Sequence, residues 1–108
     1  LSNGARTGLT GFCAGVARTT VKNNVTINGL LPGPFDTDRI AEVIAGQAKA
    51  TGASLEETRV KRMAANPSGR FGRPEEFGAA CGWLCSAHAG FVNGQNILLD
   101  GGAFPGTM

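Results

Sequence analysis

Asn66-Pro67-Ser68-Gly69-Arg70-Phe71-Gly72-Arg73-Pro74-Glu75-Glu76-Phe77 leads through a helical pattern into Asn93-Gly94-Gln95-Asn96-Ile97-Leu98-Leu99-Asp100-Gly101-Gly102, and this last third of the chain decides the fold. Pro74 suits the first turn of a helix because proline lacks an amide that this turn leaves unpaired, and the glutamates after it are favoured by the helix dipole. Residues 96–100 form a short apolar run closed by two glycines, which predicts a buried strand. We therefore expect a glycine-rich turn, a helix and a strand in this order.

A second strand is predicted earlier in the chain, over residues 25–31. This run is apolar, rich in β-branched residues and closed by Pro32-Gly33. Because helices separate it from residues 96–100, the two strands are expected to be parallel, with a right-handed connection. Two strands alone make a poor sheet in water. We therefore expect further strands, outside this chain, to complete the sheet.

Three more helices are predicted before and between these strands. The first carries an apolar stripe at helical spacing, formed by Leu9, Phe12, Cys13, Val16, Ala17 and Thr20. The second spans residues 38–49 and the third residues 54–65, with a break at Thr51-Gly52-Ala53 between them, and Ser54 and Glu57 match a capping box. With the helix that begins at Pro74, the pattern predicts four helices.

Small residues on two of these helices carry packing predictions. Gly8, Gly11 and Gly15 lie beside the apolar stripe of the first helix, where glycine is costly unless another element approaches closely. We therefore expect tight packing there. Cys81 and Cys85, four residues apart on the last helix, are expected to be small buried thiols.

Composition limits the classes of function. The chain has 108 residues, the size of one small domain, and its formal net charge of +2 is too small to indicate a nucleic-acid partner. No apolar run approaches the roughly 20 residues that a membrane helix needs, and the pattern of a signal peptide is not found. Three cysteines without zinc-site spacing or an even disulfide set indicate a reduced protein. We expect a cytoplasmic protein without a metal or a membrane segment.

Together with Leu31-Pro32-Gly33-Pro34-Phe35-Asp36-Thr37, these segments carry a family resemblance. The sequence resembles the carboxyl-terminal part of short-chain dehydrogenases/reductases (SDRs), in particular members similar to 3-oxoacyl-(acyl-carrier-protein) reductase. The resemblance implies an α/β fold, the carboxyl-terminal part of a doubly wound Rossmann-type parallel sheet with about two strands and four helices present. It also implies NAD or NADP, a small carbonyl or alcohol substrate, and a homo-oligomer, either dimer or tetramer. Residues 1–108 are expected to be part of one domain, whose amino-terminal nucleotide-binding part lies outside this chain.

The resemblance places two candidate catalytic residues near the amino terminus. SDRs carry a Tyr-x-x-x-Lys pair, and the shared pattern puts Ser2 at the tyrosine position and Arg6 at the lysine position. A serine hydroxyl is a far weaker acid than a phenol, whose pKa is about 10, whereas Arg6 keeps a positive charge and several donors. In the alternative interpretation Ser2 and Asn3 cap the first helix and Arg6 is solvated or ion-paired.

The candidate cofactor-binding residues are Pro32, Gly33, Phe35 and Thr37. They lie where a strand ends and a helix begins, and open α/β sheets bind ligands at the carboxyl ends of their strands. In the family the backbone matching Phe35 meets the nicotinamide carboxamide and the threonine matching Thr37 touches carboxamide or phosphate. Thr37 also suits a helix N-cap, so capping and cofactor contact both stay open.

Two functions from different classes therefore remain. The first is part of an NAD(P)-dependent oxidoreductase, whose residues 38–65 correspond to the helices that close over substrate in the family. Basic residues there, namely Lys49, Arg59, Lys61 and Arg62, suit either an acidic carrier or phosphate or else a solvated helix face. The second function is a non-catalytic SDR-like binding or assembly subunit, or an inactive fragment, because Ser2 and Arg6 replace the catalytic pair.

Overall fold

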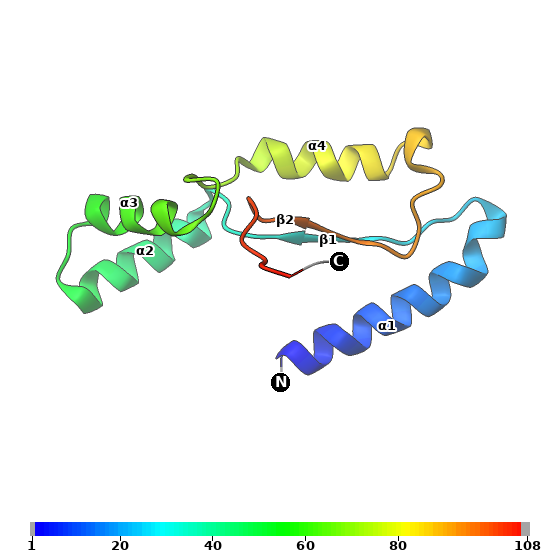
Figure 1. The fold of residues 1–108 in the computed structure, drawn as a ribbon, viewed down its shortest axis with the longest axis horizontal. Coiled ribbons are helices and arrows are strands. Elements are labelled where there is room, and N and C mark those ends of the chain that lie inside the picture. Colours follow the sequence, from blue (N-terminus) through cyan, green and yellow to red (C-terminus); the bar gives the residue numbers. More distant parts are fainter. Residues whose placement is uncertain (1, 107–108) are drawn as a thin grey trace. The chain divides into compact units, whose positions relative to one another are not determined.

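The computed structural model describes residues 2–106, with side chains from Gly4 onward, as an alternation of helices and short strands (Figure 1). The helices are α1 (Ser2–Thr20), α2 (Asp38–Thr51), α3 (Leu55–Ala65) and α4 (Pro74–Leu84), and the strands are β1 (Gly29–Pro32) and β2 (Asn96–Leu99). Two 3-10 turns, Val21–Asn23 and Ala87–Ala89, follow α1 and α4. The strands form a two-stranded parallel sheet. This element order confirms the predicted α/β class.

The described chain forms two compact units. One unit comprises Leu1–Leu31 with Gly78–Leu98, and the other comprises Pro32–Phe77 with Leu99–Met108. None of the described helices is both long and apolar enough to cross a membrane.

In the first unit, the side chain of Asn93 organises the backbone before β1. Asn93 Nδ2 donates a hydrogen bond to the carbonyl of Ala17 at 2.9 Å, and its Oδ1 accepts from the amide of Ile27 at 3.1 Å. The Ile27 carbonyl accepts from the amide of Gly94 at 2.9 Å. The Asn93 side chain takes the place of a neighbouring strand here, so β1 begins at Gly29. The predicted strand, residues 25–31, was therefore too long at its start.

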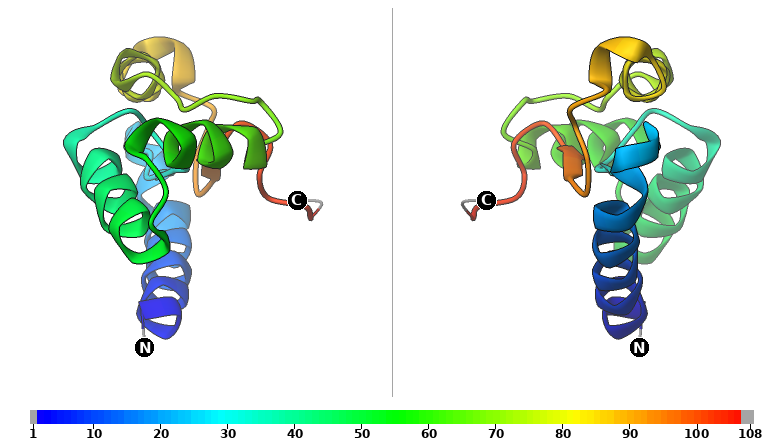
Figure 2. Two further views of the ribbon diagram at one scale, coloured as in Figure 1. Left: turned by 90° about the vertical axis from the view of Figure 1, so that its left-hand side faces the viewer. Right: turned by 90° about the vertical axis from the view of Figure 1, so that its right-hand side faces the viewer.

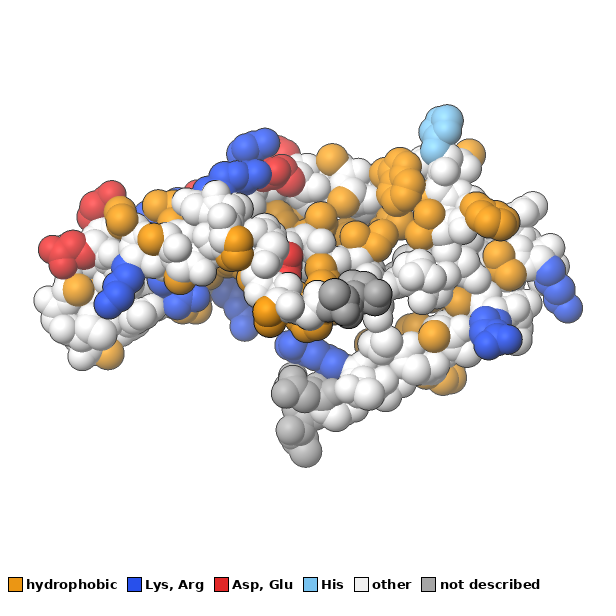
Figure 3. All heavy atoms as spheres, in the orientation of Figure 1, with side chains coloured by type: hydrophobic (Ala, Val, Ile, Leu, Met, Phe, Trp, Pro, Cys, Tyr) orange, Lys and Arg blue, Asp and Glu red, His pale blue; other side chains and the backbone are white. Residues whose placement is uncertain are grey.

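Two packing predictions of the first unit were wrong for the described residues. A methyl group added to Gly8, Gly11 or Gly15 would meet no atom within 4 Å, and the stripe residues Leu9 and Phe12 are 63% and 70% exposed. The thiols of Cys81 and Cys85 are exposed as well. The physical reason is shared: no described segment covers these helix faces. Hydrophobic side chains are accordingly spread over the visible surface in Figure 3.

In the second unit, α2 and α3 lie side by side (Figures 1 and 2). Gly52 ends α2 in a left-handed conformation, φ 74°, and Ser54 begins α3 by accepting a hydrogen bond from the amide of Glu57 at 3.1 Å. Ile44 and Ala48 are buried in α2, and Thr58 is buried in α3. The predicted break and the serine cap are thereby confirmed.

Candidate functional site

The predicted cofactor segment is held at its start by the end of β2. The amide of Gly33 donates to the carbonyl of Leu99 at 2.8 Å. A side chain on Gly33 would begin only 2.7 Å from the Cα atom of Asp100. Only glycine permits this close approach of two backbones. Gly33 therefore fixes where the segment leaves the sheet.

The middle of the segment is held by the turn that precedes α4. The amide of Gly72 donates to the carbonyl of Pro34 at 3.0 Å, and the amide of Asp36 donates to the carbonyl of Gly72 at 2.8 Å. This pair forms a parallel bridge between Phe35 and Gly72. The Phe35 ring packs edge-on against Phe77, with ring centres 5.6 Å apart. The backbone around Phe35 is thus positioned by contacts far along the sequence.

Thr37 begins α2 without using its side chain as a cap. Its backbone is extended and its carbonyl accepts from the amide of Ala41 at 3.1 Å, but its hydroxyl makes no capping hydrogen bond. The hydroxyl instead donates to the carbonyl of Phe35 at 3.4 Å, and the residue is exposed. Thr37 is therefore the N-cap residue, as predicted, but without the side-chain hydrogen bond of a cap, and cofactor contact stays a prediction.

Asp36, which the sequence patterns did not single out, ties the segment to α3. Arg59 Nη2 donates to Asp36 Oδ2 at 2.8 Å, and the guanidinium lies 5.1 Å from the centre of the Phe71 ring. The hydrogen bond to Asp36 is the main cause that raises the pKa of Arg59. Arg59, one of the basic residues predicted either to meet a ligand or to be solvated, is engaged within the protein.

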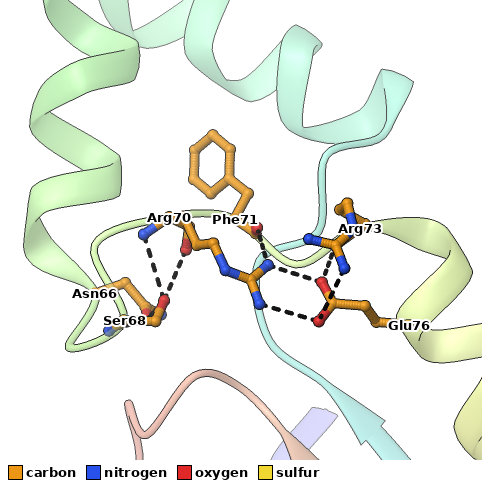
Figure 4. A network of polar contacts seen from close by, with 6 residues as sticks. All are labelled: Asn66, Ser68, Arg70, Phe71, Arg73 and Glu76. Atoms are coloured by element: carbon orange, nitrogen blue, oxygen red, sulfur yellow. Dashed lines mark hydrogen bonds and ion pairs between the residues drawn. The ribbon is translucent and has the colours of Figure 1, made fainter.

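The turn before α4 contains a polar network (Figure 4). Asn66 is buried, and its Nδ2 donates to the carbonyl of Asp100 at 3.0 Å while its Oδ1 accepts from the amide of Ser68 at 3.0 Å. Arg70 and the amide of Arg73 both donate to the carboxylate of Glu76. The shape of the turn thus rests on hydrogen bonds of its own side chains, and the same turn supports the backbone around Phe35.

A cavity of about 410 Å³ lies in the same unit as the cofactor segment. Its lining consists of Pro34, Gln47, Lys61, Arg62, Ala65, Asn66, Phe71 and Ala103. Pro34 belongs to the predicted cofactor segment, and Lys61 and Arg62 belong to α3, so the cavity joins the two regions that the sequence predicted to meet ligands. The contributions of Gln47 and Phe71 were missed, because no local pattern distinguishes them from helix-surface and core residues.

The predicted catalytic pair lies on α1. Ser2 and Arg6 are four residues apart in this helix, a spacing that places them on one face. Arg6 is exposed, while the side chain of Ser2 lies outside the described part of the chain. Ser2 belongs to the helix as the structure assigns it, and the catalytic role of the pair stays a prediction.

The family model described as enoyl-(acyl carrier protein) reductase matches residues 2–103. A short-chain dehydrogenase family protein from Francisella tularensis has a similar structure over 89% of this chain and 40% of its own, with TM-score 0.82 and 26% identity. The chain belongs to the SDR family. This membership confirms the resemblance. The chain is therefore part of an oxidoreductase family with a Rossmann-type fold.

Relatives of this SDR chain include several reductases. The 3-oxoacyl-(acyl-carrier-protein) reductase FabG of Vibrio cholerae is 31% identical over 100 residues, which are 93% of this chain and 36% of the relative. The acetoacetyl-CoA reductase of Cupriavidus necator is 31% identical over 102 residues, 94% of this chain and 37% of the relative. The solved structure of YwfH, an NADPH-dependent reductase of bacilysin biosynthesis, gives TM-score 0.83 at 26% identity over 94% of this chain and 38% of its own. The SDR chain therefore spans little more than a third of these proteins.

Proposed function

We propose that residues 1–108 are the carboxyl-terminal part of one Rossmann-type SDR domain that interconverts a small carbonyl compound and an alcohol with NAD or NADP. The observation that carries this proposal is the position of the segment from Gly33 to Thr37. Its backbone is held by the end of β2 and by Gly72, and the Thr37 hydroxyl is exposed and not used as a cap. The names of the relatives, which are reductases of 3-oxoacyl and acetoacetyl thioesters, support the direction of the chemistry.

The residues present fit the nicotinamide end of such a cofactor. A fixed backbone at Phe35 and a threonine hydroxyl with a free lone pair supply the hydrogen-bonding groups that an amide or phosphate group needs. When bound, the nicotinamide would supply or accept the hydride. The protein's own part in this proposal is to hold that ring with residues 33–37 and to orient the substrate with α2 and α3. We propose a homo-oligomer, as the family resemblance implies, in the cytoplasm, as the three unpaired cysteines indicate.

Ser2 and Arg6 are proposed as catalytic residues because of the positions that the family resemblance gives them. Arg6 is permanently charged and suits a ribose or diphosphate oxygen. Ser2 is a poor proton donor for the substrate oxygen, because its hydroxyl is far less acidic than a phenol. This departure favours the alternative function, a non-catalytic SDR-like binding or assembly subunit.

A chimera separates the two functions. Residues 2–103 would replace the matching part of Vibrio cholerae FabG, and reduction of an acetoacetyl thioester would be followed by nicotinamide absorbance. The restored pair Ser2→Tyr with Arg6→Lys would be compared with the unmodified chimera and with each single change. Restoration of both residues should raise turnover at least about a hundredfold, the low end of what a positioned general acid contributes. The phenol needs the neighbouring cation to lower its pKa, so the single changes should gain much less.

The possible results are distinct. Binding of NADPH by the unmodified chimera, with turnover only after both changes, supports the SDR site and shows that the present residues limit catalysis. Binding without turnover in every variant favours the non-catalytic subunit. Full turnover that persists after Ser2→Ala and Arg6→Ala contradicts the assignment of these two residues.

A further inference from the structure

Asp36 lies at the apex of a tight turn within the cofactor segment. The amide of Thr37 donates to the carbonyl of Phe35 at 2.9 Å, which closes a three-residue turn with Asp36 at its centre. The Thr37 hydroxyl donates to the same carbonyl at 3.4 Å. The backbone conformation of Asp36 therefore sets where the Thr37 hydroxyl lies relative to the Phe35 backbone. These are the two groups proposed to meet the nicotinamide end of a cofactor.

Two other segments of the chain hold this turn. The amide of Asp36 donates to the carbonyl of Gly72 at 2.8 Å, and its carboxylate accepts from Arg59 Nη2 at 2.8 Å. The Arg59 guanidinium also lies 5.1 Å from the centre of the Phe71 ring, and Phe71 is only 5% exposed. Since Phe71 directly precedes Gly72, which bridges to Phe35, one side chain of α3 contacts both backbone segments of this bridge.

The chemistry of arginine suits it to fix a direction. Its guanidinium is planar and rigid, so it donates to a carboxylate along a defined line while its face lies against an aromatic ring. The side chains of Arg59 and Asp36 are 33% and 49% exposed. An ion pair with this exposure adds little to the unfolding free energy, because water screens it. The contacts of Arg59 therefore matter chiefly for where Asp36 is held.

We propose that Arg59 is a positioning residue of the cofactor segment: through Asp36 it holds the turn at residues 35–37 in the shape that the nicotinamide end of the cofactor meets. This role rests on the proposed function. Arg59 acts through Asp36 and touches neither the cofactor nor the reacting atoms. Its loss lets the turn move, which weakens the contacts to the nicotinamide and leaves the contacts to the rest of the cofactor as they are.

The chimera with Vibrio cholerae FabG tests this role with two ligands, NADPH and 2′-phospho-ADP-ribose, which is NADPH without its nicotinamide. Arg59→Gln should weaken NADPH binding about threefold to tenfold, the combined contribution of an exposed ion pair and a cation–π contact. The affinity for 2′-phospho-ADP-ribose should stay unchanged, whereas a general loss of structure would weaken both ligands. Asp36→Asn should act in the same way. Arg59→Lys keeps the charge and should recover part of the loss.

Nuclear magnetic resonance of the 108-residue chain examines the turn without any cofactor. Asp36→Asn and Arg59→Gln should each displace the backbone amide signals of residues 35–37. The double variant should show no larger displacement than the single variants, because both changes remove the same contact. Arg18→Gln is the matched control, since Arg18 is an exposed arginine of α1 that makes no ion pair with any residue from 4 to 106.

Each result points to one conclusion. Additive displacements in the double variant, an NADPH affinity that survives Arg59→Gln, or an equal loss in Arg18→Gln would overturn the role of Arg59 and leave the proposed function intact. Equal affinities of the unmodified chimera for the two ligands would contradict the proposed function, and the role of Arg59 with it. Where a variant chimera does not fold, the amide signals of the 108-residue chain decide.

Discussion

Arg70 binds Glu76 through two parallel hydrogen bonds, from Nη1 to Oε1 at 2.7 Å and from Nη2 to Oε2 at 2.9 Å. The amide of Arg73 donates to Oε1 of the same carboxylate at 2.8 Å, which ties the turn to the first turn of α4. Figure 4 shows Arg70 and Arg73 converging on the Glu76 carboxylate. Bidentate pairs of this kind are the stronger and more directional ion pairs.

The ion pair between Arg70 and Glu76 should make the stability of the folded chain depend on pH. The hydrogen bond from Arg70, followed by that from the Arg73 amide, lowers the pKa of Glu76 from 4.5 to about 2. Because the pKa is lower in the folded state, the stabilisation is present above pH 4.5 and is lost as the pH falls toward 2. Glu76→Gln should therefore flatten the fall of the urea-unfolding free energy across this window. Glu75→Gln is the control, and an equal flattening there would contradict the assignment.

Gly33→Ala should destabilise the chain. The added methyl group would begin 2.7 Å from Asp100 Cα, and a backbone cannot yield as a flexible side chain does. We expect a loss of about 1–3 kcal/mol in unfolding free energy, the usual cost of overpacking. Gly46→Ala, in the interior of α2 with no atom near the added methyl group, should stabilise by about 0.5–1 kcal/mol. Urea denaturation measures the unfolding free energy of both variants. A change of the same sign in the two variants would contradict the prediction.

Asn66→Asp tests the buried amide while keeping the size of the side chain. The change removes the Nδ2 donor and places a carboxylate oxygen against the carbonyl of Asp100. We expect a loss of about 1–3 kcal/mol, the cost of an unsatisfied buried polar group. Asn23→Asp, on an exposed turn, should change the stability little. If both variants unfold at the same urea concentration as the parent chain, the Asn66 amide is not a structural link.

The exposed apolar face of α1 predicts concentration-dependent association. Leu9 and Phe12 are 63% and 70% exposed, and apolar patches of this kind drive contact with other protein. Leu9→Gln with Phe12→Gln should lower the average mass in sedimentation at micromolar concentration. Leu55→Gln with Val60→Gln removes two exposed apolar groups from α3 and is the control. A compact monomer before any change would contradict the prediction.

Local chemistry determined what the sequence predicted correctly. The break at Gly52, the cap at Ser54 and the helix start at Pro74 each depend on residues within one turn, and each appears where the pattern indicated it. The family motif likewise identified the fold class. Residues 33–37 follow the end of β1 at Pro32, as predicted, while their role in cofactor binding stays a prediction.

What the sequence did not predict depends on residues distant in the chain. β1 begins at Gly29 because the amide of Ile27 donates to the side chain of Asn93 and not to a neighbouring strand. No local sequence pattern contains that contact. Cys81 and Cys85 were predicted to be buried from their helical spacing alone, but spacing does not supply the element that would cover them.

The close approach of Gly33 and Asp100 has a consequence for anyone who wishes to redesign this chain. The residues that follow Asp100 reach the wall of the cavity at Ala103, and Asp100 itself lies against the glycine from which the cofactor segment starts. Mutagenesis libraries aimed at the tail for a new substrate would therefore also disturb the segment proposed to receive the nicotinamide. Variants with altered selectivity should be screened for cofactor preference in the same experiment.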